Sequence, residues 1–276
     1  MKRINKILLF GFILLISSCI EPFSPNLDNV SSAKFVVDGQ ITDQEGYQIV
    51  SISNTSTVNN PNNNPLSGCD VKIIDNLGNV FNLVEFNAGK YRGWTDKQYL
   101  KSGNSYQVKI ITSNGIEIVS EMDQMPECPA VDSIYYHRID FPSNNPFKPR
   151  QAIQFYMDFD GGDANCRHYR WELTETWEHR AAYPKSLYWN GYEIITVRPV
   201  DFSKYYCWSV EKIKNIFTLS TLNLRENKFD KFKFHLVDDQ TERLTYGYSL
   251  LIEQYALSES AYKFWNELRI TSNEQG

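Results

Sequence analysis

The sequence lacks the short motifs that mark the common enzyme classes. It contains no His-Glu-x-x-His, no Gly-x-Ser-x-Gly, no phosphate-binding glycine loop and no dinucleotide fingerprint. Histidine itself is scarce, and its four copies have no spacing typical of metal ligands: His137, His168, His179 and His235. We therefore predict that the protein is not an enzyme and has no cofactor.

An excess of positive charge is also absent. The chain has 28 lysines and arginines against 33 aspartates and glutamates. Three of the basic residues lie in the first eighteen positions, so the rest of the chain has a balance of about −8. This balance argues against a nucleic-acid partner, and against electrostatic attraction to anionic lipid.

Long apolar runs are absent except at the N-terminus. Residues 7–16 are apolar apart from Gly11, and they follow the basic residues Lys2, Arg3 and Lys6. As a helix this run would rise about 15 Å, which is half of a hydrocarbon core. The run therefore predicts a signal peptide rather than a membrane span, and we assign residues 1–18 to it.

The apolar run ends in Ile16-Ser17-Ser18-Cys19, which resembles the lipobox of bacterial lipoproteins. The resemblance implies cleavage before Cys19 and acylation of that cysteine, whose acyl chains would anchor the protein to a membrane. Residues 19–32 contain two prolines and no periodicity, and we expect them to be the lipidated tether. The alternative is an ordinary signal peptide that ends in a cysteine by chance.

The next region, residues 33–127, contains short β-type runs separated by turn sequences such as residues 75–79. Several strands in fewer than about 100 residues predict a small immunoglobulin-like β-sandwich. The sequence pattern of residues 66–73, 89–91 and 103–108 resembles that of the prealbumin-like or carboxypeptidase-regulatory sandwiches. That resemblance implies a structural or binding module.

Two prolines, Pro126 and Pro129, mark the expected domain boundary, since neither can donate a hydrogen bond inside a central strand. Residues 128–276 predict a second, antiparallel β-rich domain. Its longest expected strand is half buried, because one set of residues is apolar and the alternating set is polar. The first set is Tyr169, Trp171, Leu173 and Trp177, and the second is Arg170, Glu172, Thr174, Thr176 and Glu178.

One helix is expected near the C-terminus. Ser258 is a favourable N-cap, and Glu259 suits the first turn. The residues expected on its apolar face are Ala261, Phe264, Trp265 and Leu268. The predicted fold class is therefore mainly β, with an N-terminal sandwich, a second antiparallel domain and this helix.

Four further cysteines are Cys69, Cys128, Cys166 and Cys207. An even number in an oxidising compartment suggests disulfides, for which three connectivities exist. We expect Cys69–Cys128 and Cys166–Cys207, one in each domain. The alternative is that all four are buried free thiols.

An acidic cluster in the second domain is a candidate Ca²⁺ site, formed by Asp158, Asp160, Asp163 and Asn165. The spacing departs from the EF-hand loop, because Gly162 takes the place of a ligand and Tyr169 that of the closing glutamate. The favoured interpretation is a solvated turn between two strands.

Three glutamates, Glu172, Glu175 and Glu178, raise the question of a glycosidase-type carboxylate pair. Glu172 and Glu178 would share one strand face and Glu175 the other, so that solvated strand positions are the favoured interpretation.

An aromatic hairpin tip is predicted around Asn190-Gly191, with Tyr188, Trp189 and Tyr192 beside it. If exposed, these rings could stack on a sugar or on a partner. The alternative is that they fold back into a core.

A candidate glycosylation site is Ser133. The sequence Asp132-Ser133-Ile134 matches the short Asp-Ser/Thr-apolar sequence used for O-glycosylation of exported Bacteroidota proteins. A three-residue match also occurs by chance.

Several longer sequence segments resemble one protein family. They are residues 19–23, 35–43, 169–171, 175–178, 207–208 and 248–258. They resemble the Bacteroidota outer-membrane lipoproteins known as domain of unknown function 4249, over nearly the whole mature chain. In that family the pattern continues beyond the helix, so we expect the second domain to be incomplete at Gly276. The family has no established catalytic residues to carry over, and Cys69 stands where a small apolar residue is expected.

The resemblance implies an outer-membrane lipoprotein, often encoded beside a TonB-dependent receptor. The leading hypothesis is a non-enzymatic binding or accessory subunit of such a barrel, on the periplasmic or the surface-exposed face. A surface glycan-binding module that uses Trp189 is the second hypothesis. A hydrolase whose carboxylates meet only in the fold is the third.

Overall fold

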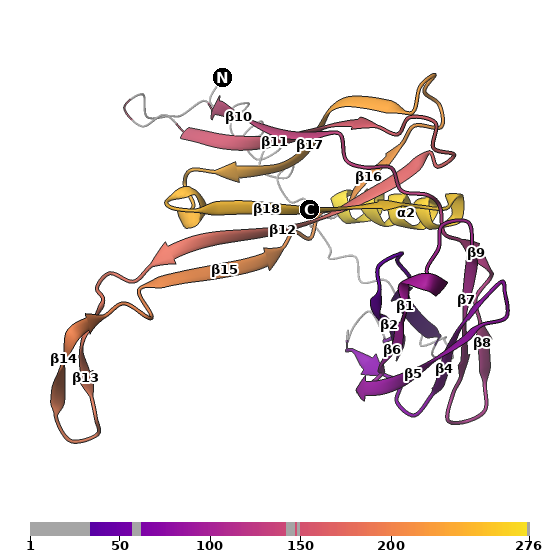
Figure 1. The fold of residues 1–276 in the computed structure, drawn as a ribbon, viewed down its shortest axis with the longest axis horizontal. Helices are drawn as coiled ribbons and strands as arrows, with labels where there is room; N and C mark the ends of the chain where they lie inside the picture. The colour runs from indigo at the N-terminus through magenta and orange to yellow at the C-terminus, as the bar shows by residue number, and fades with distance from the viewer. Residues whose placement is uncertain (1–33, 57–61, 142–146, 148–149, 275–276) are drawn as a thin grey trace, which may run out of the picture.

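The computed structural model describes residues 34–56, 62–141, 147 and 150–274. In this part of the chain the fold is mainly β, with antiparallel sheets and a single α-helix, α2 (Glu259–Glu274), at the C-terminal end (Figure 1). The predicted fold class is confirmed. Within the same residues no helix has the length and the apolar character needed to cross a bilayer.

The expected N-terminal sandwich takes the form of one curled sheet. Its order is β1-β2-β6-β5-β4-β7-β8, with β3 beside β2 and β9 beside β7. Alternating residues of strands from both ends of the sheet, such as Ile52, Val71 and Ile110, meet in one core. The strands are β1 (Phe35–Gln40), β2 (Gly46–Asn54), β3 (Asn64–Pro65), β4 (Asp70–Asp75), β5 (Val80–Asn87), β6 (Lys90–Thr95), β7 (Ser105–Ile111), β8 (Glu117–Val119) and β9 (Asp123–Gln124).

The predicted turn between β4 and β5 owes its shape to Asp75. The Asp75 carboxylate accepts hydrogen bonds from the N–H groups of Leu77 and Asn79, at 3.0 and 2.8 Å. The β5–β6 turn depends on Gly89, whose φ is +66°. A Cβ there would lie 2.5 Å from the Ile52 carbonyl oxygen, so any other residue would clash.

The second part packs two antiparallel sheets face to face. One has the order β10-β11-β17, and in the other β12 lies between β18 on one side and β15 and β16 on the other. Met157 and Phe159 from the first sheet and Tyr169, Trp171 and Leu173 from the second form the core between them. The strands are β10 (Ser133–Phe141), β11 (Arg150–Asp160), β12 (His168–Arg180), β15 (Tyr206–Lys212), β16 (Phe217–Ser220), β17 (Lys228–Asp238) and β18 (Tyr248–Ala256).

Helix α2 begins where predicted, because Ser258 Oγ accepts a hydrogen bond from the Ala261 N–H at 3.1 Å. Its contact face differs from the predicted one. Trp265 is half buried against the second sheet, but Phe264 and Leu268 are exposed. The apolar contact face of the helix is therefore narrower than the predicted face of four apolar residues.

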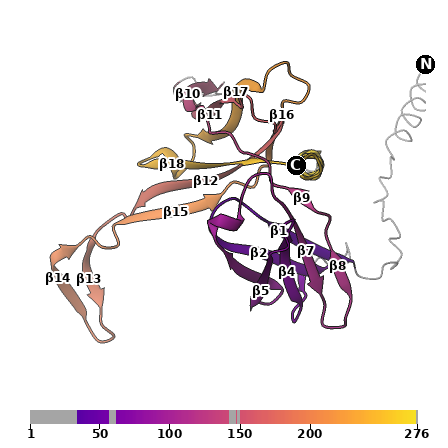
Figure 2. The same cartoon turned by 45° about the vertical axis from the view of Figure 1, so that its right-hand side comes forward.

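Strands β13 (Lys185–Trp189) and β14 (Ile194–Asp201) pair only with each other. Figures 1 and 2 show this two-stranded ribbon projecting from the far ends of β12 and β15, away from both packed sheets. We call residues 185–201 the arm.

Candidate functional site

The arm exposes the aromatic residues predicted at its tip. Tyr188 is 41%, Trp189 63% and Tyr192 90% exposed, so they do not fold back into a core. The tip is held by Asn190, whose side-chain oxygen accepts hydrogen bonds from the N–H groups of Tyr192 and Glu193, both at 2.8 Å. A fixed turn therefore presents these rings to the surroundings. A binding role for them stays a prediction.

A second group of exposed apolar side chains lies on the sheet from which the arm projects. Tyr206, Trp208 and Val210 alternate along β15, and Leu251 lies on β18, all on the sheet face opposite the core. Each of the four side chains is more than half exposed. Helix α2 covers only the other end of this face, around Arg170. We call Tyr206, Trp208, Val210 and Leu251 the outer face.

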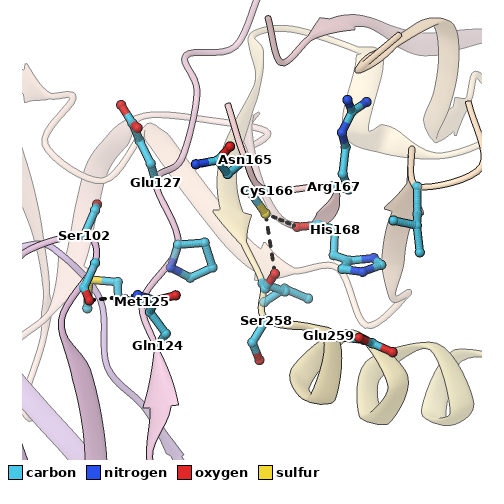
Figure 3. A pocket seen from close by; sticks show the side chains of 14 residues that line it. Ser102, Gln124, Met125, Glu127, Asn165, Cys166, Arg167, His168, Ser258 and Glu259 are labelled. Carbon is cyan, nitrogen blue, oxygen red and sulfur yellow. Dashed lines mark hydrogen bonds between the residues drawn. The ribbon is translucent and has the colours of Figure 1, made fainter. Parts of the chain in front are cut away.

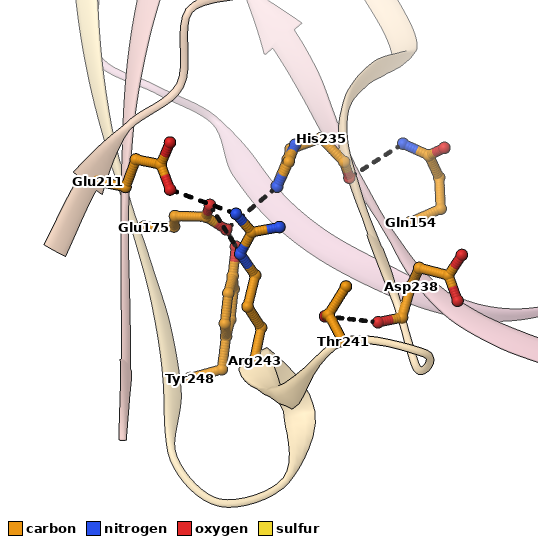
Figure 4. A network of polar contacts seen from close by, with 8 residues as sticks. All are labelled: Gln154, Glu175, Glu211, His235, Asp238, Thr241, Arg243 and Tyr248. Carbon is orange, nitrogen blue, oxygen red and sulfur yellow. Dashed lines mark hydrogen bonds and ion pairs between the residues drawn. The ribbon is translucent and has the colours of Figure 1, made fainter. Parts of the chain in front are cut away.

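A buried carboxylate lies between the two packed sheets (Figure 4). Glu175 is 2% exposed, and its carboxylate lies 3.3 Å from His235 Nε2 and accepts a hydrogen bond from the Tyr248 hydroxyl at 3.0 Å. Arg243 Nε lies 3.1 Å from the other carboxylate oxygen, and Arg243 also pairs with Glu211. The expectation that Glu175 is solvated was therefore wrong.

This network ties the sheets together rather than leaving a free acid or base. Burial lowers the pKa of His235, with a further contribution from Arg243, although Glu175 opposes the shift. Burial and the negative charge of Glu175 raise the pKa of Tyr248. Each carboxylate oxygen has a partner, so proton transfer by Glu175 would require the network to break.

A pocket of about 460 Å³, lined by both polar and apolar side chains, lies between the N-terminal sheet and the start of α2 (Figure 3). Cys166 lines it, but its thiol donates to the carbonyl oxygens of His168 and Leu257, at 3.1 and 3.4 Å. Burial raises the pKa of this thiol, so it stays protonated and is a poor nucleophile. His168 stacks on Tyr262, with ring centres 4.5 Å apart, and burial lowers its pKa.

Comparison with known proteins assigns the family. A family model described as domain of unknown function (DUF4249) matches residues 20–276. The chain belongs to the DUF4249 family. No curated protein matches the chain.

In the described part of this DUF4249 chain the four cysteines are free thiols, and neither expected disulfide is formed. Cys166 precedes the first residue of β12, whereas Cys207 lies opposite His179 near its last residue. At about 3.3 Å per residue these ends are roughly 35 Å apart, far beyond disulfide reach. The Cys69 N–H bonds to the Tyr91 hydroxyl in the N-terminal sheet, whereas Cys128 contacts Gln254 on β18.

The acidic cluster does not form the considered Ca²⁺ site. Asp158 accepts hydrogen bonds from the Lys231 N–H at 2.8 Å and the Tyr135 hydroxyl at 3.0 Å, and the first of these lowers its pKa most. Asp160 accepts a hydrogen bond from the Gly162 N–H, as in an ordinary turn. Among the residues with described positions, Asp163 included, no three acidic, His or Cys side chains gather around one point. Asn165 lines the pocket beside the start of α2 instead.

The remaining predicted sites are Ser133 and Cys19. Ser133 is the first residue of β10 and is exposed, and its hydroxyl lies 3.4 Å from Asp158. Its glycosylation stays a prediction. Cys19 lies outside the described residues, and so does the predicted tether.

Proposed function

We propose that the protein is a lipid-anchored, non-enzymatic accessory subunit of the outer membrane that binds a TonB-dependent β-barrel through its outer face. The observation that carries the proposal is the uncovered row of Tyr206, Trp208 and Val210 on β15. Contiguous exposed apolar groups of this kind mark interaction sites, and Trp and Tyr are enriched at the centres of interfaces.

The kind of partner is proposed from the N-terminal sequence and the family resemblance. A lipobox at Cys19 would place the chain at a membrane, where a barrel protein is within reach. The acidic balance of the chain argues against nucleic acid as the partner.

A binding role is preferred over catalysis because the strongest catalytic candidates are occupied. Glu175 is fully paired in its buried network, and Cys166 is a hydrogen-bonded thiol. A hydrolase would need a free carboxylate pair or an activated nucleophile at a substrate.

The test is a gentle-detergent pull-down of the tagged, lipidated protein from its own membranes, read by mass spectrometry. We expect a stoichiometric TonB-dependent barrel with the native chain and loss of the barrel with Trp208→Ser. The matched control is Trp94→Ser, which changes a tryptophan of similar exposure on the N-terminal sheet. Repeated recovery of the lipoprotein alone would contradict the proposal.

Glycan binding is a second candidate, favoured by the exposed rings of Trp189 and Tyr192 at the arm tip. Aromatic rings at a fixed turn can stack on the faces of sugars. In affinity gels of common polysaccharides, retardation of the native chain and its loss with Trp189→Ala would support this role. No retardation on any polysaccharide would end it.

A further inference from the structure

The arm is a two-stranded ribbon with no core of its own. Its strands pair only with each other, and every residue of β13 is exposed. A single hairpin is marginally stable in water, because it cannot bury its apolar side chains. The arm nevertheless carries large apolar residues along most of its length, all exposed: Leu187, Tyr188, Trp189, Tyr192, Ile194 and Val200.

Apolar groups lie on both faces of this ribbon. Trp189 pairs across with Ile194, and the adjacent pair, Tyr188 with Ile195, points to the opposite face. A flat protein surface can cover only one face of a ribbon. An environment that surrounds the ribbon covers both faces. The boundary between lipid headgroups and acyl chains is an environment of this kind.

The charge and chemistry of the arm suit that boundary. The arm has two basic residues, Lys185 and Arg198, and two acidic ones, Glu193 and Asp201, so it is neutral within a chain of net charge −5. No net charge has to approach the lipid, unlike the rest of the protein. Trp and Tyr are the side chains enriched at membrane–water interfaces, because each combines an apolar ring with a polar group.

We propose that the arm inserts its tip into the interface of a lipid bilayer, so that the protein contacts the membrane at a second place besides its lipid anchor. Trp189, Leu187 and Ile194 on one face, and Tyr188 and Ile195 on the other, enter the apolar side of the boundary. The backbone edges of the ribbon stay at headgroup level, where water satisfies them. The inference does not rest on the proposed barrel partner, because the outer face and the arm are separate surfaces.

The test uses the chain from residue 19 onward with Cys19→Ser, which keeps every described residue and removes the acyl chains that would themselves bind vesicles. We expect this protein to sediment with phosphatidylcholine vesicles. Brominated lipid should quench tryptophan emission, and the quenching should disappear in Trp189→Phe. Removing one large apolar side chain, in Trp189→Ser or Leu187→Ser, should lower the partition coefficient about tenfold or more.

The control is again Trp94→Ser, which should bind vesicles like the parent chain. Circular dichroism should be unchanged in both arm variants, since the substituted side chains are exposed. No sedimentation of the parent chain, or equal binding by parent and arm variants, would overturn the proposal. Loss of the barrel in Trp189→Ser without vesicle binding by the parent would also overturn it, in favour of a protein contact.

Discussion

The guanidinium carbon of Arg170 lies 3.9 Å from the centre of the Trp265 ring. Arg170 belongs to β12 and Trp265 to α2, so the stack fastens the helix to the second sheet. The same guanidinium donates a hydrogen bond to Gln40 of β1 at 2.9 Å and pairs with Glu172. One buried cation therefore joins the N-terminal sheet, the second sheet and the helix.

Replacing this cation should loosen all three elements at once. We expect Arg170→Leu to lower the free energy of unfolding by about 3 kcal/mol, because Glu172 and Gln40 lose a buried partner. Urea denaturation measures the change. The control is Lys212→Ala, which removes the exposed partner of Glu172 and should cost less than about 1 kcal/mol. Equal losses of stability from the two substitutions would show that Arg170 does not join the three elements.

The half-buried His235 should make the protein less stable in mild acid. Its pKa is lowered in the folded state, mainly by burial, so the unfolded chain binds a proton more readily. The free energy of unfolding should be fully retained above the unfolded pKa of about 6.5, and it should fall as pH drops from there toward the lower folded value.

Denaturation at about pH 7.5 and at about pH 5.5 measures this dependence. His235→Gln should be less stable at both pH values and should lose part of the difference between them. His168, whose pKa is also lowered by burial, accounts for a further part. A parent protein that is more stable at the lower pH would contradict the sign of the shift.

The thiols should all react without reduction. The structure leaves Cys69, Cys128, Cys166 and Cys207 unpaired, with Cys128 exposed and Cys166 buried. In the folded protein we expect Cys128 to be alkylated first and Cys166 last. In denaturant, the intact mass of the chain with Cys19→Ser should report four alkylated cysteines before any reductant is added. Cysteines that are alkylated only after reduction would show that disulfides are present, as first expected.

Two tryptophans should differ in their effect on stability. Trp171 is 1% exposed in the core between the sheets, and Trp171→Ser should cost about 4 kcal/mol. Trp189→Ser should change the free energy of unfolding by less than about 0.5 kcal/mol, since its ring touches no core. Thermal and urea unfolding measure both changes in stability. A strong destabilisation by Trp189→Ser would show that the arm tip is packed in a core.

The strands and the helix follow from local patterns, and so they were predictable. The alternation of apolar and polar residues predicted β12, and the turn residues around Asp75 predicted a hairpin. Ser258 predicted the start of the helix. The position of Glu175 was also within reach of the same reasoning. It shares its strand face with Trp171 and Trp177, and a carboxylate on an apolar face needs buried partners.

The partners themselves were out of reach, because His235 and Arg243 come from elements about 60 residues away or more. Local pattern carries no information about such pairings. The same limit explains the wrong disulfide pairs, which depend on where the two ends of β12 lie. The burial of Arg170 on an otherwise polar strand face depends on the helix that covers it.

The central claim is that the outer face binds a membrane barrel. The most direct test places a photo-crosslinking amino acid at position 210 of the lipidated protein in its own cells, with the same probe at position 94 as control. We predict an adduct that contains a TonB-dependent barrel from position 210 and none from position 94. No adduct from position 210, or the same adducts from both positions, would contradict the account.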